Sequence, residues 1–517
     1  MLLATTALVL TALAAQATPA PEPRYPERLS AWETRAGWTL LFDGVDARAW
    51  STKDGEPRVD DGWLVPPKDA TFEWSGTLGD FELELLHRDA AENAAALASH
   101  DPLAFVARTA IGTRLRAVAR ANTLELWDGT LHFDPVEVHA NSRVSLGPIT
   151  AWIDATTKRW HVALTSSSSA AAFRSLRARE FDALPPPKPL FDGTTLTGWR
   201  AIGDARWTVE DGALVGAVGG GRQSFLASET EFADFVLDVD LKNELPGNSG
   251  IQVRSHQNAK GAVYGNQIEI DPSARAWSGG LYDEGRRGWL ADLSKDPLAR
   301  AAFRPGEWNH YRIECIGPHV RTWVNGTPCV DTLDPIDASG FLAFQVHSGN
   351  DTKLRWKNAE LRELGASPWA PLALAVTPPE NGGAPFVTNS TGRWRAAESV
   401  DDVVLRLAWT KAPTCDYRLL VRRTLAPLRG LDWADITDAA SDVGWDFAFD
   451  ATTQRAQGSA PWYAVFAGSR VQITPPNGER WTTNDLRAPS TGPLELRGTP
   501  GAPGPVGELV LDARRPR

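Results

Sequence analysis

The chain has 517 residues, which is more than one hydrophobic core organises, and ordinary domain sizes predict about three domains. Its formal net charge is −11 and its Lys and Arg residues are scattered, which excludes the basic patch expected of a nucleic-acid-binding or anionic-membrane-binding protein. The 22 Trp residues offer flat surfaces that suit stacking on sugar rings, although Trp also fills the cores of β-sandwiches.

The first residues predict export. Residues 1–17 form a short apolar run that ends in Ala15-Gln16-Ala17, an A-x-A-like cleavage site, although no Lys or Arg precedes the run. The run is too short to span a membrane, and no other segment approaches the roughly 20 apolar residues that a spanning helix needs. We therefore expect a signal peptide, a secreted or periplasmic protein, and no membrane insertion.

The rest of the chain repeats one sequence plan. Residues 41–65 and 190–215 both begin with Leu-Phe-Asp-Gly, continue with a Trp and end in an Asp-Gly turn followed by apolar residues. A fainter third copy begins near residue 400, and Pro-rich segments at 185–187 and 368–379 read as linkers between the copies. The plan predicts a degenerate domain at 30–184, a well-preserved domain at 187–364 and a divergent domain at 370–517.

Each copy consists of short alternating runs broken by Gly, Asn, Asp and Pro, which predicts β-strands and turns in a sandwich or barrel. Asn325-Gly326 is typical of a tight hairpin turn. Helical periodicity is scarce, apart from a capping box at residues 30–33 that predicts one short helix. The fold class is therefore all-β, with three sandwiches in tandem.

Strand parity predicts a polar face on the middle domain. Ile251, Ile268, Ile270 and Phe344 alternate with polar residues and should face the core. The opposite face would then carry Gln252, Arg254, Gln267, Glu269, Asp271, Gln345 and His347. A solvated outer sheet is the ordinary explanation, but these residues are the donors and acceptors that a hydroxyl-rich ligand needs.

The flanking copies are poorer at the matched positions. Copy one has Ala104 and Val106 there, although it keeps Glu125 and gains Trp127, through which it could still bind sugar. Copy three keeps Arg422 but shows no matching Glu or His. The middle copy is therefore expected to be the functional one.

Several ordered blocks in residues 187–364 closely resemble the 3-keto-disaccharide hydrolase family. They are Leu190-Phe191-Asp192-Gly193 with Trp199, Asn248-Ser249-Gly250-Ile251, residues 267–271, Gly280-Leu281-Tyr282, Val324-Asn325-Gly326 and residues 340–347. The resemblance implies a concanavalin A-like jelly-roll fold, and hence tandem jelly rolls of which the middle one is best preserved. It also implies cleavage of glycosides whose sugar carries a 3-keto group.

Such a reaction needs a base for the C2 proton, an acid for the leaving oxygen and a group that stabilises the enolate. His347 and Glu269 are the candidate bases, Arg254 could hold the enolate, and Tyr282 could act as acid or as a sugar platform. Substrate contacts are expected from the remaining face residues and nearby aromatics, namely Gln252, Gln267, Asp271, Gln345, Trp289 and Trp277.

No cofactor follows from the sequence. The ligand types of Glu269, Asp271 and His347 would also suit a divalent metal, but their spacing does not demand one. Two other functions remain open, a non-catalytic carbohydrate-binding protein with several domains and a purely structural β array. The expected partner is a carbohydrate, with no nucleic acid and no identifiable protein partner.

Overall fold

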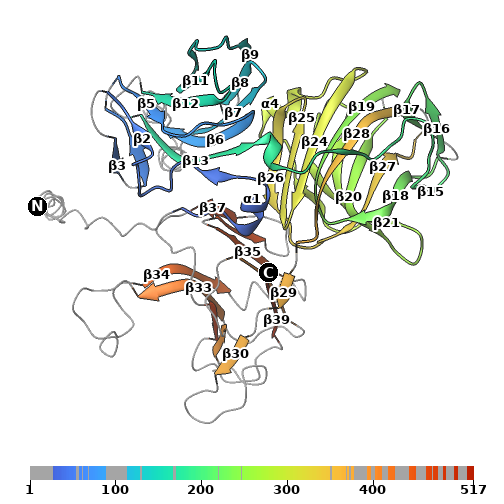
Figure 1. Ribbon diagram of the computed structural model, residues 1–517. Helices are drawn as coiled ribbons and strands as arrows, with labels where there is room; N and C mark the ends of the chain where they lie inside the picture. The colour runs from blue at the N-terminus through green and yellow to red at the C-terminus, as the bar shows by residue number, and fades with distance from the viewer. Residues whose placement is uncertain are drawn as a thin grey trace, which may run out of the picture.

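The computed structural model describes residues 27–516, except 89–112, 378–392, 397–401, 410–416, 426–441, 450–461, 475–480, 485–493, 499–508 and gaps of one to four residues elsewhere. It is built almost entirely of strands, which form three pairs of sheets (Figure 1). The predicted signal peptide at residues 1–17 lies outside the described residues. No described helix combines the length and apolar composition that crossing a bilayer would take.

The first sandwich comprises β1 to β13. Its larger sheet has the order β3 (Arg58–Asp60), β4 (Trp63–Val65), β13 (Ala172–Glu180), β6 (Phe81–Arg88), β7 (Thr113–Arg120), β8 (Thr123–Asp128) and β9 (Leu131–Glu137), with β1 (Thr39–Leu40) beside β13. The smaller sheet has the order β10 (Val144–Leu146), β11 (Ile149–Ile153), β12 (Trp160–Thr165), β5 (Thr71–Trp74) and β2 (Trp50–Ser51). The capping box predicted at Ser30 does form, and it starts α1 (Ala31–Arg35).

The middle sandwich comprises β14 to β28. One sheet, here called the outer sheet, has the order β15 (Trp199–Ile202), β18 (Ser224–Phe232), β27 (Gly340–Val346), β20 (Ser249–Gln257), β21 (Val263–Ile270), β22 (Leu281–Glu284) and β23 (Gly288–Ala291). The second sheet has the order β16 (Arg206–Glu210), β17 (Ala213–Ala217), β28 (Lys353–Gly365), β19 (Asp234–Leu245), β24 (Trp308–Ile316), β25 (His319–Val324) and β26 (Thr327–Leu333). In addition, β14 (Lys188–Pro189) pairs with β28, and α4 (Pro297–Ala301) precedes β24.

The third sandwich comprises β29 to β39. One sheet has the order β29 (Trp369–Pro371), β39 (Leu509–Pro516), β32 (Val403–Trp409), β35 (Trp462–Ala467), β36 (Arg470–Thr474) and β37 (Trp481–Asn484). The other sheet has the order β30 (Leu374–Thr377), β31 (Arg393–Ala396), β38 (Leu494–Gly498), β33 (Tyr417–Leu425) and β34 (Asp442–Phe449). In one sheet of each sandwich, the last strand (β13, β28 or β39) lies beside the first of four adjacent strands, which are β6-β7-β8-β9, β19-β24-β25-β26 and β32-β35-β36-β37. This common order agrees with a repeated plan, while the sequence repeat itself stays a prediction.

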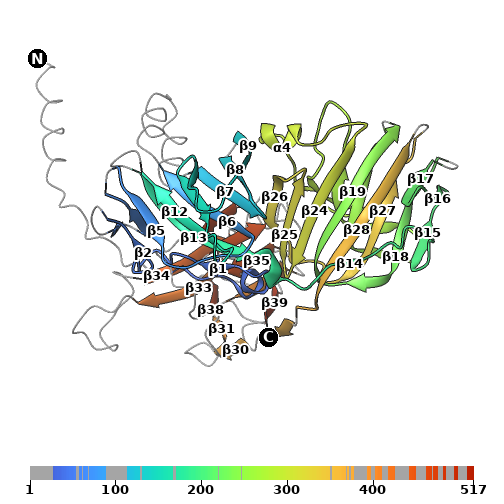
Figure 2. The same cartoon turned by 45° about the horizontal axis from the view of Figure 1, so that its top comes forward.

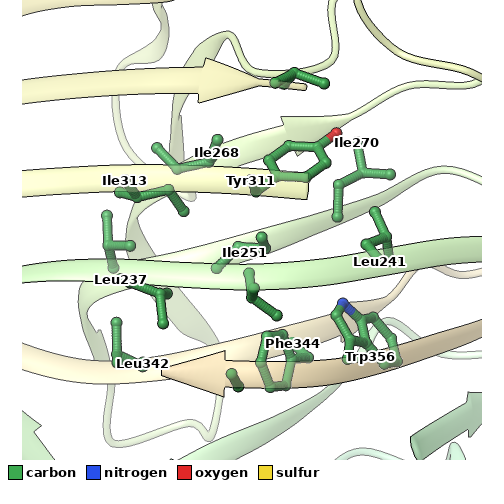
Figure 3. Packing of buried hydrophobic residues seen from close by; sticks show 14 of the residues in the cluster. Leu237, Leu241, Ile251, Ile268, Ile270, Tyr311, Ile313, Leu342, Phe344 and Trp356 are labelled. Atoms are coloured by element: carbon green, nitrogen blue, oxygen red, sulfur yellow. The ribbon is translucent and has the colours of Figure 1, made fainter. Parts of the chain in front are cut away.

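The core of the middle sandwich lies between its two sheets (Figure 3). Ile251, Ile268 and Phe344 of the outer sheet pack against residues of the second sheet such as Leu237 and Trp356, and all five are buried. Period-two alternation therefore placed the apolar face of the outer sheet correctly, and burial of this face is the main source of stability. The opposite face of the same sheet is left for the polar residues.

An apolar cluster joins all three sandwiches. It contains Trp32 of α1 and Trp38 from the first part of the chain, Ile316 and Leu333 of the middle sandwich, and Val465 of the third. The third sandwich also reaches the middle one through Gln472, whose Oε1 accepts from the backbone N–H of Leu333 at 3.0 Å. Figure 2 shows the first and middle sandwiches next to each other from a second direction.

Alternating Trp and Arg side chains line the junction of the first and middle sandwiches. Arg116 lies 4.5 Å from the ring centre of Trp127 and 5.5 Å from that of Trp323. Arg321 lies 4.6 Å from Trp323 and 5.3 Å from Trp38. These cation–π contacts involve indole rings that are buried in the junction and therefore cannot stack on a sugar. Trp127, expected as a sugar contact of the first domain, is instead a buried junction residue.

Candidate functional site

Four side chains form one row across the outer sheet. Gln252 of β20 lies opposite Gln267 of β21, Gln267 opposite Tyr282 of β22, and Tyr282 opposite Trp289 of β23. Directly opposed residues of antiparallel strands point to the same side of the sheet. The row therefore follows the face opposite to the core, as strand parity predicted for the two glutamines.

Hydrogen bonds connect the buried polar residues of this face. Ser255 Oγ donates to Gln252 Oε1 at 2.6 Å, and Gln252 Nε2 donates to Gln267 Oε1 at 2.7 Å. Gln267 Nε2 in turn donates to Glu269 Oε2 at 3.3 Å. A chain of this kind fixes each carboxamide in one orientation, because both carboxamides accept through oxygen and donate through nitrogen. It ends at a carboxylate.

The Glu269 carboxylate is the centre of the candidate site. Glu269 is only 4% exposed, and its Oε1 accepts from Asn248 Nδ2 at 2.8 Å and from Arg275 Nη2 at 2.7 Å. Burial nevertheless raises the pKa of Glu269 above its ordinary value, and the bonds from Asn248 and Arg275 oppose this only in part. A buried carboxylate with a raised pKa holds a proton more strongly than an ordinary carboxylate, which suits a group that accepts and returns a proton.

Arg275 lies in the turn that follows β21 and was not expected in the site from the sequence. Its Nε donates to Asp271 Oδ2 at 2.7 Å, so the guanidinium bridges Asp271 and Glu269. The same group lies 5.0 Å from the ring centres of both Trp277 and Trp289. Asp271 also accepts from the Ser273 backbone and hydroxyl, and so it holds the turn that carries Arg275.

Aromatic side chains border the carboxylate. The Trp277 and Trp289 ring centres are 4.8 Å apart at nearly a right angle, and Tyr282 meets Trp289 edge-on at 5.2 Å. Burial, followed by the nearby carboxylates of Glu284 and Glu269, raises the pKa of Tyr282 above its ordinary value. Its hydroxyl therefore keeps its proton at neutral pH.

The prediction that Arg254 shares this face is wrong. Arg254 has a φ of +48° at an irregularity in the pairing of β20, where the register shifts between Val253 and His256. Its buried guanidinium donates to Asp234 Oδ1 at 2.9 Å and to the carbonyl oxygen of Ala233 at 2.6 Å. Because one extra residue interrupts the alternation, Ser255 takes the place next to Gln252 and Arg254 becomes a structural residue at the end of the sandwich.

Gln345 and His347 stay on the side of the sheet that parity assigned to them. Gln345 lies two residues from Ala343, the cross-strand partner of Gln252, and both polar atoms of its side chain are buried with no hydrogen-bond partner among the described residues. His347 is half-buried, and its Nδ1 lies 2.8 Å from the Ser348 carbonyl oxygen. An electrostatic interaction links His347 to Glu284, the residue two positions beyond Tyr282.

The alternative of a metal held by Glu269, Asp271 and His347 gains no support from the geometry. Within the described part of the chain, no group of three or more His, Cys, Asp or Glu side chains is placed to hold a metal ion. Glu269 and Asp271 both face Arg275, a cation that already forms an ion pair with each of them.

Comparison with known proteins was consistent with the sequence resemblance. Residues 186–362 match the family described as the 3-keto-alpha-glucoside-1,2-lyase-like domain. A curated protein of Bacteroides thetaiotaomicron, named 3-keto-disaccharide hydrolase, is 37% identical over 94 residues. That match covers 15% of this chain and 32% of the relative's length.

Two solved structures are similar over about a third of the chain. The carbohydrate-binding module CBM66 of Bacillus subtilis has 18% identity and a TM-score of 0.26, covering 34% of this chain and 100% of that one. A Bacillus subtilis protein of unknown function with a galectin-like fold has 14% identity and a TM-score of 0.29, covering 35% and 96%. At these scores the two structures add nothing to the assignment, which depends on the sequence match. The similarity to the 3-keto-alpha-glucoside-1,2-lyase-like domain family is therefore carried by residues 186–362, which make up the middle domain.

Proposed function

We propose that the middle domain cleaves glycosides whose sugar carries a ketone at C3. The observation that carries the proposal is the buried Glu269 carboxylate, whose pKa is raised and which lies beside a cation and aromatic side chains. The name of the matched family contains the word lyase and the positions 1 and 2, and the curated relative is named a hydrolase of 3-keto-disaccharides. Both names fit a reaction that begins at C2.

The chemistry follows from the ketone. A carbonyl at C3 acidifies the C2 proton, so a carboxylate base can remove it and leave an enolate whose negative charge is spread to the C3 oxygen. The electron pair then forms the C1–C2 double bond while the C1–O bond breaks, and the departing oxygen takes a proton from an acid. Addition of water across the double bond completes a net hydrolysis.

The arrangement supports the following roles. Glu269 is the base, and Arg275 replaces Arg254 as the cation that stabilises the enolate oxygen. Tyr282 keeps its proton and is the acid for the leaving oxygen, with His347 as the second group able to exchange protons. Trp289 and Trp277 provide a sugar platform. The sugar hydroxyls would bond to Gln252, Gln267 and Gln345, while Asp271 positions Arg275.

The test is incubation of the purified full chain with a chromogenic 3-keto-glucoside, with and without a chelator. Release of the chromophore that depends on Glu269 and not on the chelator is the expected result. The matched unoxidised glucoside is the control, because it lacks the acidic C2 proton and should not react. Binding of the 3-keto-glucoside without release would favour the alternative function, a non-catalytic carbohydrate-binding protein.

We also propose that the protein is exported to the periplasm or the exterior, since residues 1–17 end in an A-x-A-like cleavage site. Expression of the full-length chain in its native type of host, followed by N-terminal sequencing of the extracytoplasmic fraction, tests this. A mature chain that begins just after Ala17 is the expected result, and an uncleaved chain retained in the cytoplasm would contradict it.

A further inference from the structure

A second polar cavity lies between the first and middle sandwiches, away from the candidate site. Its volume is about 340 Å³, and both sandwiches contribute to its wall. The lining residues are Asp80, Arg120 and Phe181 of the first sandwich and Asp238, His310, Arg312, Glu360 and Arg362 of the middle one. Cavities of roughly 300 Å³ and above are large enough for small ligands.

Cationic groups outnumber carboxylates in this wall. Asp238 is shared by three cations, because Arg312 Nη1 lies 3.2 Å, His310 Nε2 3.3 Å and Arg362 Nη1 3.8 Å from its carboxylate oxygens. Hydrogen bonds from His310 to Asp238 and Asp240 raise the pKa of His310 to about 9, so the imidazole is charged at neutral pH. Among the lining residues, three guanidinium groups and one imidazolium therefore face three carboxylates, and Asp240 pairs with His310 from outside the lining.

Arg120 is the exposed cation of this wall that has no direct partner in the part of the chain that the structure describes. Within the described residues its guanidinium has neither a hydrogen bond nor an ion pair, and it lies 4.3 Å from the ring centre of Phe181. Partial burial and then the repulsion from Arg312 lower the pKa of Arg120, and the carboxylates of Asp238 and Glu82 oppose this only in part. An anion placed between Arg120 and Arg312 would relieve this repulsion.

The walls of the cavity are held in place before any ligand arrives. Arg312 Nε donates to Glu314 Oε1 at 3.1 Å, and Glu314 accepts from the buried Arg179 of the first sandwich at 2.6 Å. Asp80 accepts from the backbone N–H of Ala121 at 2.9 Å, which fixes the end of β7 that carries Arg120. A preorganised site loses little free energy to ordering when it binds.

We propose that this cavity binds a small oxyanion, either a free sulfate or phosphate or the carboxylate of a single sugar acid. Arg120 and Arg312 would contact the anionic group, and Phe181 would provide the apolar surface beside it. The site requires both sandwiches, because Arg120 and Phe181 come from one and Arg312 and His310 from the other. The first domain would then contribute to ligand binding at the junction even though the polar face of its own sheet is poor.

Isothermal titration of the full chain tests the proposal, with sulfate, phosphate and glucuronate as probes and glucose as the neutral analogue of glucuronate. Ionic strength is kept constant with sodium chloride, because general screening would otherwise imitate weak binding. The expected result is saturable binding of at least one oxyanion and none of glucose. Sulfate or phosphate alone would identify a free-ion site, whereas glucuronate would identify a sugar-acid site.

Three variants test whether binding depends on the residues of this cavity. Arg120→Ala should weaken the binding by about tenfold or more, whereas Arg48→Ala, a change at an exposed arginine of the first sandwich, should leave it unchanged. Glu360→Gln removes an opposing carboxylate from the wall and should strengthen binding by about threefold or more, which a misfolded variant could not do. Equal binding by the wild type and Arg120→Ala, or weaker binding by Glu360→Gln, would overturn the proposal.

Discussion

Arg275 donates a hydrogen bond of 2.7 Å to Glu269 from a turn that Asp271 holds in place. The contact joins a buried carboxylate on a strand to a cation on a loop, and the cation lies 5.0 Å from the ring centre of Trp289. It gives the site a base and a positive charge within one hydrogen bond of each other. The pH dependence and the catalytic rate should therefore respond differently to changes at the two residues.

Replacing Glu269 by Gln should abolish the proposed cleavage. The amide has nearly the same shape and can still accept from Asn248, but it cannot accept the C2 proton. We expect kcat/KM for a 3-keto-glucoside to fall by at least about a hundredfold, with the same circular dichroism spectrum and affinity for a non-reactive analogue. Full activity in this variant would remove Glu269 from the mechanism.

Replacing Arg275 by Ala should move the pH profile. Arg275 lowers the pKa of Glu269, so its loss lets burial raise that pKa further. The base must be deprotonated to act, and the acidic limb of the kcat/KM profile should therefore move to higher pH. Arg275→Lys keeps the charge and should give a smaller shift. A drop in rate with an unmoved limb would show that Arg275 acts on the substrate only.

Gly250 has no side chain, and the Gln267 carboxamide of the neighbouring strand occupies the space that a side chain would fill. A Cβ at this position would come within 2.3 Å of Gln267 Cδ, so Gly250→Ala should push the carboxamide away from Glu269. We expect about a tenfold loss in kcat/KM, since small misplacements of aligned groups are costly. The double variant Gly250→Ala with Gln267→Ala relieves the overlap; it should fold as well as Gln267→Ala alone and have the same activity. If Gly250→Ala is fully active, Gln267 has no positioning role.

The sequence alone correctly predicts which side chains of the regular strands point to the core. Ile251 and Ile268 were assigned to the core, and Gln252 and Gln267 to the opposite side, because a side-chain period of two survives wherever pairing is regular. Arg254 was assigned wrongly because a register shift consumes one residue, and a positive φ at an arginine leaves no signal in a single sequence.

Residues that reach the site from turns could not be found in this way. Arg275 and Asn248 meet at Glu269 only because the segments that carry them fold back over the sheet, and no strand period relates them to it. The Trp content was also ambiguous, since Trp289 borders the candidate site whereas Trp127 and Trp323 lie under Arg116 at the domain junction. The composition gives the number of Trp residues, but it does not show which indole faces are covered by other side chains.

The junction should make the first and middle sandwiches unfold together. Arg179 is buried between Glu82 of β6 and Glu314 of β24, at 2.5 and 2.6 Å. Arg179→Ala leaves two buried carboxylates without their common partner, and this should lower the free energy of unfolding by about 3–5 kcal/mol. Urea denaturation followed by Trp fluorescence measures the loss, and Arg48→Ala, at an exposed ion pair, should show no measurable change. Separate unfolding transitions already present in the wild type would contradict the coupling.

The same junction should make the protein sensitive to acid. Burial alone would raise the pKa of Glu84, but Arg321 and Arg177 lower it from 4.5 to about 2. Since the pKa is lower in the folded than in the unfolded chain, the ion pairs stabilise the protein fully above about pH 4.5. This contribution is lost as the pH falls from there towards 2.

Urea denaturation at pH 7, 4.5 and 3 should therefore show a stability that changes little in the first interval and falls in the second. Glu84→Gln removes the titrating group while keeping its shape, so this variant should be less stable at pH 7 and lose less stability between pH 4.5 and 3. Other buried carboxylates, such as Glu82, share the low pKa, and some acid sensitivity should remain. An identical fall in wild type and variant would mean that the Glu84 pairs with Arg177 and Arg321 contribute nothing to the junction.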